Sequence, residues 1–180
     1  MDVHKVCHLN VLFVKAGLIK VHDKNVVSYD AYAKSCGLSA HIFLKDPFDK
    51  SMEAKVYSLL KEWQKKPEYG IGEIFFREEV NEKYHLNGDF SFVIETDGCT
   101  SFGNHVDGEE VSATRNDDYK FGRATHGYLP FKGPQPTFIA KGPDFRRGVV
   151  IPNANTVDEA PTLAKLLGFE MKNVDGRVLN

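Results

Sequence analysis

The spacing of apolar residues predicts a helix at the start of the chain. From residue 2 to residue 17 apolar side chains recur every three or four positions, which is the period of one helix face, and Gly17 offers a helix end. Residues 18–21 then alternate between apolar and polar, and residues 26–29 follow a turn at Asp23. This second pattern predicts a β-hairpin directly after the helix.

Residues 38–95 alternate between strand and helix patterns. Strands are expected over three ranges that are rich in β-branched and aromatic residues: 38–45, 73–76 and 90–95. Between them, a helix with Ser51 as its N-cap runs to Pro67, and residues 77–84 predict a short charged helix. The order strand, helix, strand, helix, strand predicts a compact α+β unit.

The remaining residues are less periodic. Residues 97–136 are rich in Gly, Asp, Asn and Pro, which predicts a long loop. Two short strands are expected after it, over residues 136–141 and 149–151. Thr156 and Glu159 have the spacing of a capping box, so the last helix begins there, and Gly168 ends it.

Composition excludes some classes of protein. The chain has 180 residues, of which 42% are hydrophobic and 27% charged, and this balance is typical of a folded core. Its 23 basic and 25 acidic residues give a formal net charge of −2, which argues against binding of a nucleic acid duplex through charge. Its apolar runs are shorter than the roughly 20 residues of a membrane-spanning helix, so no membrane partner is expected.

Cysteine usage favours a reducing compartment. The three cysteines lie far apart and form no C-x-x-C pair, which predicts reduced thiols rather than a disulfide framework. The first residues lack the apolar stretch of a signal peptide. The reduced cysteines favour a cytoplasmic location, whereas the missing signal peptide bears on location only if Met1 is the native start.

His126 is the candidate site residue. It lies in the run Ala-Thr-His-Gly-Tyr-Leu-Pro at residues 124–130, within the irregular segment, and Gly127 beside it leaves the imidazole accessible to a metal ion. His4 and His8 have the i, i+4 spacing of helical zinc sites. No third ligand stands near that pair, so a solvated or half-buried helix face is the simpler interpretation.

Other chemistry-bearing patterns are weaker. His105 with its acidic neighbours Asp107, Glu109 and Glu110 could bind a cation, although a solvated acidic loop is the simpler interpretation. The chain has no G-x-G-x-x-G segment, no P-loop and no G-x-S-x-G. Nucleotide binding through a glycine-rich loop and hydrolysis through a nucleophile elbow therefore have no support.

Four segments in the last third carry a resemblance to a known family. Their ranges are 124–130, 136–143, 157–168 and 175–177. Together they resemble the C-terminal end of the type I phosphodiesterase/nucleotide pyrophosphatase family, a branch of the alkaline phosphatase superfamily. Residues 6–19 resemble the helix that follows the Asp-His-Gly motif of that family, and residues 38–95 resemble its small insertion.

The resemblance implies a fold and a division of the chain. The expected class is α/β, with an α+β insertion within the C-terminal part of an alkaline-phosphatase-like α/β/α sandwich. Residues 1–35 would be a helix and hairpin of the catalytic domain, and residues 36–105 the insertion. Residues 106–180 would be the C-terminal part of the catalytic domain, including the His-Gly loop. Strands 137–141 and 149–151 would lack neighbours, so self-association through exposed edges is expected.

The resemblance also implies an activity. The family hydrolyses phosphate diesters or phosphoanhydrides, including nucleotides, with two metal ions that are commonly zinc, and His126 resembles one metal ligand. The nucleophile, the Asp-x-x-x-His pair and the Asp-His-Gly motif have no counterpart here. This absence places Met1 at an internal position of a longer enzyme, and the chain is expected to be inactive alone.

Two alternatives remain open at this stage. The chain could be a stand-alone, non-catalytic α+β binding domain that uses the His126 loop as a ligand or partner surface. It could also belong to another branch of the superfamily, such as a sulfatase, a phosphonate hydrolase or a phosphomutase.

Overall fold

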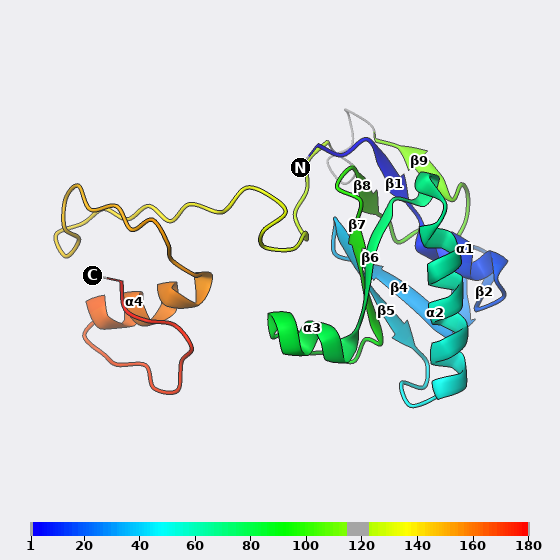
Figure 1. The fold of residues 1–180 in the computed structure, drawn as a ribbon, viewed down its shortest axis with the longest axis horizontal. Coiled ribbons are helices and arrows are strands. Elements are labelled where there is room, and N and C mark those ends of the chain that lie inside the picture. Colours follow the sequence, from blue (N-terminus) through cyan, green and yellow to red (C-terminus); the bar gives the residue numbers. More distant parts are fainter. Residues whose placement is uncertain (1, 115–122, 180) are drawn as a thin grey trace. The chain divides into compact units, whose positions relative to one another are not determined.

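The computed structural model describes residues 2–114 and 123–179. The chain divides into two compact units, residues 1–135 and residues 136–180, and each is described by itself. Strands and helices are both present, so the fold is mixed α and β, as the sequence predicted (Figure 1). The predicted division of the chain into residues 1–35, 36–105 and 106–180 refers to parts of a larger parent domain. It stays a prediction.

A four-stranded antiparallel sheet forms the centre of the first unit. Its strands have the order β4-β5-β7-β6. Their bounds are β4 Ala31–Ser35, β5 Ser39–Leu44, β7 Phe92–Thr96 and β6 Ile71–Phe76. The predicted strands at 38–45, 73–76 and 90–95 are confirmed, whereas β4 was not expected. β4 contains Lys34 and Ser35, which weaken its apolar pattern.

One face of this sheet packs against α1 (Leu9–Lys15) and α2 (Lys50–Gln64). Val56, Leu60 and Trp63 are the buried side chains of α2, and their spacing places them on one helix face. The predicted N-cap at Ser51 is wrong. Asp49 caps the helix instead, and its carboxylate accepts the backbone N–H of Met52 at 2.9 Å.

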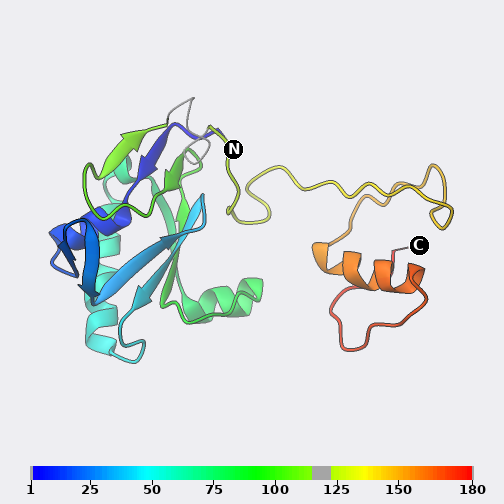
Figure 2. The ribbon, with the colours of Figure 1, turned by 180° about the vertical axis from the view of Figure 1, so that it is seen from behind.

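The opposite face of the sheet carries a second, smaller core. α3 (Arg77–Tyr84) lies on the other side of the sheet from α2 (Figures 1 and 2), and its predicted range is confirmed. Val80 of α3 packs with three buried side chains, Phe75, Phe90 and Val93. The short 3-10 helix η1 (Pro67–Tyr69) leads from α2 into β6.

Residues near the N-terminus form a strand where a helix was expected. β1 (Lys5–Cys7) is the middle strand of a three-stranded sheet, between β8 (Thr100–Phe102) and β9 (Val111–Ala113). It runs parallel to β8 and antiparallel to β9. The predicted helix over 2–17 is therefore wrong in its first half, and only α1 remains. The predicted loop over 97–136 is wrong where it contains β8 and β9, and residues 115–122 of it lie outside the described residues.

The predicted hairpin is confirmed. β2 (Ile19–His22) pairs with β3 (Asn25–Tyr29) in antiparallel register. Asp23 and Lys24 form the turn, and both have positive φ angles of 48° and 65°. Such a left-handed pair is typical of a two-residue hairpin turn, so the turn fixes the register of the two strands.

The second unit contains η3 (Thr156–Asp158) and α4 (Glu159–Leu166). Its helix is close to the predicted one, but the capping box lies one residue earlier, between Asn155 and Asp158. The strands expected over 136–141 and 149–151 are wrong, since those residues form no strand. Ile139 and Val150 are 86% and 84% exposed, so no neighbouring strand covers them.

Asp158 organises the second unit. Its buried carboxylate accepts backbone N–H groups of Asn155 at 2.9 Å and of Arg177 at 2.8 Å. These two hydrogen bonds, with the Arg177 side chain nearby, lower the pKa of Asp158 below its ordinary value.

Across residues 2–114 and 123–179, no helix has the length and apolar character needed to cross a membrane.

Candidate functional site

His126 lies on a segment that joins the first unit at several backbone positions. We call residues 123–135 the strap. The backbone N–H of Val3 donates to the carbonyl of Arg123 at 2.6 Å, and the N–H of Leu38 donates to the carbonyl of His126 at 2.9 Å. The backbone of His126 is therefore fixed against the turn between β4 and β5.

Two glycines allow the strap to approach that turn closely. Gly127 has a φ of +89°, and a Cβ atom there would lie 1.7 Å from the carbonyl oxygen of Cys36. Gly37 has a φ of +86°, and a Cβ atom there would lie 2.4 Å from the carbonyl oxygen of His126. Glycine is thus required on both sides of the contact, which gives the His-Gly pair a physical reason.

The His126 side chain is exposed, while its carbonyl oxygen makes the hydrogen bond to the sheet. An exposed imidazole on a fixed backbone can supply one metal ligand. A catalytic zinc ion needs three protein ligands and an open position. Within residues 2–114 and 123–179, no group of three or more His, Cys, Asp or Glu side chains could hold a metal ion. Within those residues, His126 is therefore not part of a group that could hold a metal ion by itself.

Glu95 is a buried carboxylate beneath the strap. It is 2% exposed and lies on β7, yet its partners come from the strap. Its Oε1 accepts the backbone N–H of Leu129 at 3.0 Å and lies 3.9 Å from the Lys132 ammonium. Lys132 also pairs with Glu73 of β6 at 3.1 Å. Glu95 thus connects the sheet to the strap.

The pKa of Glu95 is raised by its surroundings. Burial is the main cause, and the neighbouring Glu73 carboxylate acts in the same direction. The Leu129 N–H and the Lys132 ammonium oppose this rise. Sequence reasoning missed Glu95, although one signal was present. The residue alternates with Val93, a core position, so its side chain lies on a buried sheet face.

The pair formed by His4 and His8 does not share a helix face. His4 is exposed and precedes β1, whereas His8 is buried at the N-cap position of α1. The predicted helical spacing is therefore wrong. The His8 ring stacks on His105 with centroids 4.4 Å apart and planes 3° apart, and its Nε2 lies 3.0 Å from Ser112 Oγ. Burial, and next the nearby His105, lower the pKa of His8 to about 4.

The acidic loop uses its carboxylates in structural contacts. Glu110 accepts a hydrogen bond from Lys15 at 2.7 Å and another from the Tyr69 hydroxyl at 2.7 Å. Lys15 and Tyr69, in that order, lower the pKa of Glu110. Asp107 lies 3.8 Å from the Lys24 ammonium. These contacts join the loop to α1, η1 and the hairpin rather than forming a cation site.

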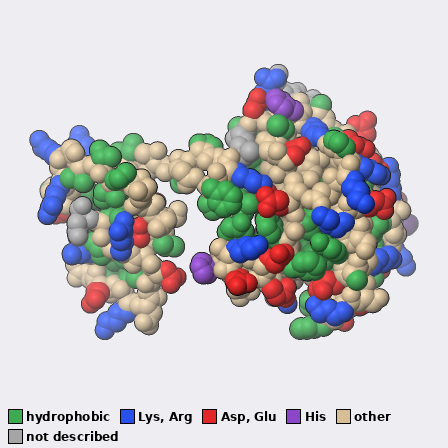
Figure 3. Space-filling model, viewed as in Figure 1, with side chains coloured by type: hydrophobic (Ala, Val, Ile, Leu, Met, Phe, Trp, Pro, Cys, Tyr) green, Lys and Arg blue, Asp and Glu red, His purple; other side chains and the backbone are tan. Residues whose placement is uncertain are grey.

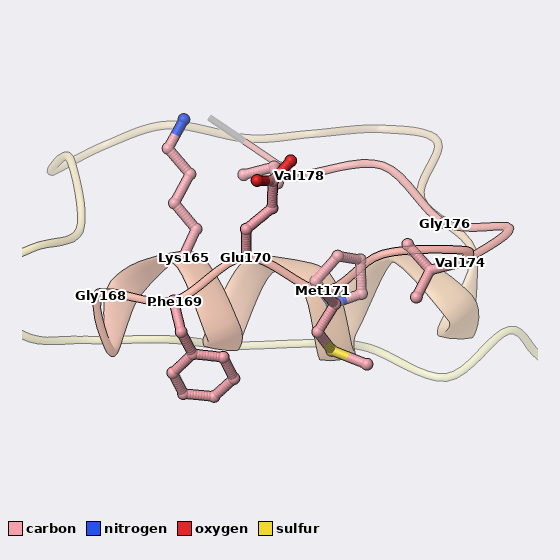
Figure 4. A pocket seen from close by; sticks show the side chains of 9 residues that line it. Lys165, Gly168, Phe169, Glu170, Met171, Val174, Gly176 and Val178 are labelled. Atoms are coloured by element: carbon pink, nitrogen blue, oxygen red, sulfur yellow. The ribbon is translucent and has the colours of Figure 1, made fainter.

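A shallow pocket of about 520 Å³ lies in the second unit (Figure 4). Its lining residues are Pro161, Lys165, Gly168, Phe169, Glu170, Met171, Val174, Gly176 and Val178. Figure 4 shows the side chains of Lys165 and Glu170 pointing away from those of Phe169 and Met171. No polar groups converge on one point, so the pocket has no catalytic arrangement.

The surface charge of the first unit is mixed. On the face visible in Figure 3, acidic and basic side chains are interspersed, and no extended basic patch is seen there. No protein-family model, curated protein or solved structure matches this chain. Any functional assignment therefore depends on the sequence resemblance and on the residues described above.

Proposed function

We propose that this chain is part of a metal-dependent hydrolase that cleaves phosphate diester or phosphoanhydride bonds. The activity corresponds to a type I phosphodiesterase/nucleotide pyrophosphatase, and the parent fold to an alkaline-phosphatase-like α/β/α sandwich. The substrate is a phosphodiester or a nucleotide. The observation that supports this best is His126, whose exposed imidazole stands on a backbone fixed to Leu38.

The local structure of His126 suits a metal ligand. The carbonyl oxygen of His126 is engaged by Leu38, so the residue is positioned without use of the imidazole. Gly127 adds no side chain that could cover the ring. When bound, two divalent ions such as zinc polarise phosphoryl oxygens and lower the pKa of the attacking group. Under this proposal His126 provides one nitrogen ligand, and the other ligands and the nucleophile lie outside the described residues.

The second unit supplies a supporting observation. Apolar side chains of its helix and connecting segments are exposed, including Phe138, Ile139, Val150 and Leu167. Where such side chains form one contiguous patch, the patch marks contact with another surface. In the parent sandwich this contact would be the remainder of the sheet. In the chain alone we expect self-association, which sedimentation velocity at several protein concentrations measures.

Zinc stoichiometry of the purified chain is the first test. The chain is loaded with zinc, desalted and analysed by mass spectrometry, beside His126→Ala and a control variant, His22→Ala, which removes another exposed histidine. We expect close to zero zinc per chain in all three proteins. One or two zinc ions per chain, lost only in His126→Ala, would show that the chain builds a complete site by itself.

The positive test uses the gene. The reading frame upstream of Met1 should encode an Asp-His-Gly run, and the longer product should hydrolyse bis-p-nitrophenyl phosphate with zinc. His126→Ala in that product should reduce the rate by about a hundredfold or more, since even partners of metal ligands contribute 10- to 100-fold. An unchanged rate would overturn the proposal. A ribosome-binding site and a stop codon directly upstream would favour the stand-alone binding domain.

Substrate panels separate the branches of the superfamily. A phosphodiesterase or pyrophosphatase should prefer diesters and nucleotide anhydrides over sulfate esters and phosphonates. Faster turnover of a sulfate ester or a phosphonate by the longer product would assign a sulfatase or a phosphonate hydrolase instead, and phosphoryl shift within one substrate would assign a phosphomutase.

A further inference from the structure

We propose that Glu95 is the positioning residue of the strap: its buried carboxylate, bonded to the Leu129 N–H and paired with Lys132, fixes where the His126 imidazole is presented. The role of this positioning in catalysis rests on the proposed function of His126. We call the contacts of Glu95 with Leu129 and Lys132 the clamp. The clamp lies within the described residues and can be tested without a metal ion.

Burial makes Glu95 unusual for its place in the fold. Charged side chains are almost never fully buried unless they are paired, and a valine or leucine would suit this sheet position better. Glu95 is 2% exposed, and the described contacts of its carboxylate go to the strap. The contacts with the strap therefore explain why a carboxylate stands at this buried position, whereas packing in the core does not.

Two hydrogen bonds anchor the strap here, one at His126 itself and one at Leu129 shortly after the His-Gly pair. The carbonyl of His126 accepts the Leu38 N–H at 2.9 Å, and three residues later the Leu129 N–H donates to Glu95 at 3.0 Å. The side chain of Leu129 also packs against the second core, which includes Val93. Only two residues lie between these anchors, so little backbone freedom remains for the His-Gly turn.

Titratable groups around Glu95 come from the strap and from the strands β6, β5 and β4. Lys132 of the strap lies between two carboxylates, 3.9 Å from Glu95 and 3.1 Å from Glu73 of β6. On β5, His41 is paired with Val93 and so shares the sheet face of Glu95, and Lys34 of β4 is opposite His41. Burial lowers the pKa of His41, with Lys34 second, and both favour its neutral form.

Amide hydrogen exchange and imidazole NMR signals of the metal-free chain test the clamp. Glu95→Leu removes both contacts, whereas Glu95→Gln keeps an acceptor for Leu129 and removes only the charge. Glu73→Gln is the matched control, because Glu73 also pairs with Lys132 but makes no described bond to the strap backbone. Fluorescence of Trp63, the single tryptophan, reports whether each variant is folded.

We expect Glu95→Leu to accelerate exchange at the Leu129 and Leu38 amides by roughly ten- to a hundredfold, the effect of one lost charge-assisted hydrogen bond. The His126 imidazole signals should shift and broaden. Glu95→Gln should give a smaller change and so a partial rescue, and Glu73→Gln should resemble the wild type. A purely structural role for Glu95 would alter global unfolding without moving the His126 signals.

Wild-type exchange rates and His126 signals in a folded Glu95→Leu variant would overturn the proposal. If that variant does not fold, unchanged His126 signals in both Glu95→Gln and Lys132→Met would overturn it instead. Failure of the proposed function is a separate result. A strap that loosens in Glu95→Leu supports the clamp even if His126→Ala leaves the activity of the longer enzyme intact.

Discussion

Replacing Asn10 with alanine should destabilise the first unit more than the removal of so small a side chain suggests. Asn10 is fully buried on α1, and its amide makes two hydrogen bonds to one residue of β4. Its Nδ2 donates to the carbonyl of Ala33 at 2.8 Å, and its Oδ1 accepts the N–H of Ala33 at 2.7 Å. The side chain thus takes the place of a neighbouring strand at the edge of the sheet.

The size of the effect follows from these two bonds. Alanine leaves the N–H and the C=O of Ala33 buried without their partner, and each such group costs about 1–3 kcal/mol. We therefore expect the free energy of unfolding to fall by about 3 kcal/mol. With a urea m-value of about 2 kcal/mol/M, the unfolding midpoint should fall by roughly 1.5 M. Trp63 reports the transition well, because its ring contacts Phe13 of α1 edge to face at 5.2 Å.

The control is Asn81→Ala, which changes the same residue type at an exposed position of α3. Its effect should stay within about 0.5 kcal/mol, as for most surface substitutions. Asn10→Asp keeps an acceptor for the Ala33 N–H but buries a charge beside the Ala33 carbonyl, so it should destabilise at least as strongly. An Asn10→Ala midpoint equal to that of Asn81→Ala would refute the reasoning.

Three further predictions concern pH, backbone and thiols. Because the folded pKa of His8 is about 4 and its ordinary value 6.5, the unfolded chain binds its proton first, so stability is lost as the pH falls from 6.5 towards 4, by about 3 kcal/mol at most. His8→Gln should flatten urea midpoints measured across that range, and an unaltered profile would contradict this assignment. Gly127→Ala should loosen the strap and speed exchange at nearby amides, whereas Gly148→Ala, also at positive φ but in open space, should affect only its own surroundings; equal effects of the two would argue against the close contact. Ellman's reagent should label exposed Cys99 rapidly and leave Cys7, whose pKa burial raises to about 12, unreactive until the protein unfolds; fast labelling of Cys7 in the folded protein would contradict its burial.

Local pattern predicted the elements whose partners are near in sequence. α3 and the β2–β3 hairpin, and α2 apart from its cap, followed from apolar spacing and turn residues. β1 did not, because its Val6 and Cys7 follow Val3 at the i+3 and i+4 positions of one helix face. What makes them a strand is pairing with Thr100–Phe102 and Val111–Ala113, about 95 residues away or more, and no short window contains that information.

The same limit explains the strands that were expected and are not formed. Residues 136–141 and 149–151 have β-branched and aromatic side chains, which favour extended backbone. Extended backbone becomes a strand only when another strand supplies hydrogen bonds, and the second unit supplies none at these residues. The predicted strands are therefore wrong, because the pattern within each segment carries no information about a partner strand.

The candidate site was predictable only in part. His126 was identified from the Ala-Thr-His-Gly run, and the structure explains why Gly127 follows it. Glu95 was hidden because a glutamate in an alternating strand is ordinarily assigned to the solvent face. Its burial depends on Leu129 and Lys132, which come from a segment without periodicity, so the partnership became visible only in three dimensions.

The central position of β1 has a consequence for biosynthesis. The four-stranded sheet is complete once residue 96 has been made, but β1 must wait for β8 and β9, about 95 and 105 residues after it. At roughly 5–20 residues per second, the ribosome leaves β1 unpaired for about 5–20 s. Its apolar Val6 and Cys7 are exposed during that interval, when chaperones act. Slowed translation between residues 96 and 113 should therefore increase aggregation of the nascent chain.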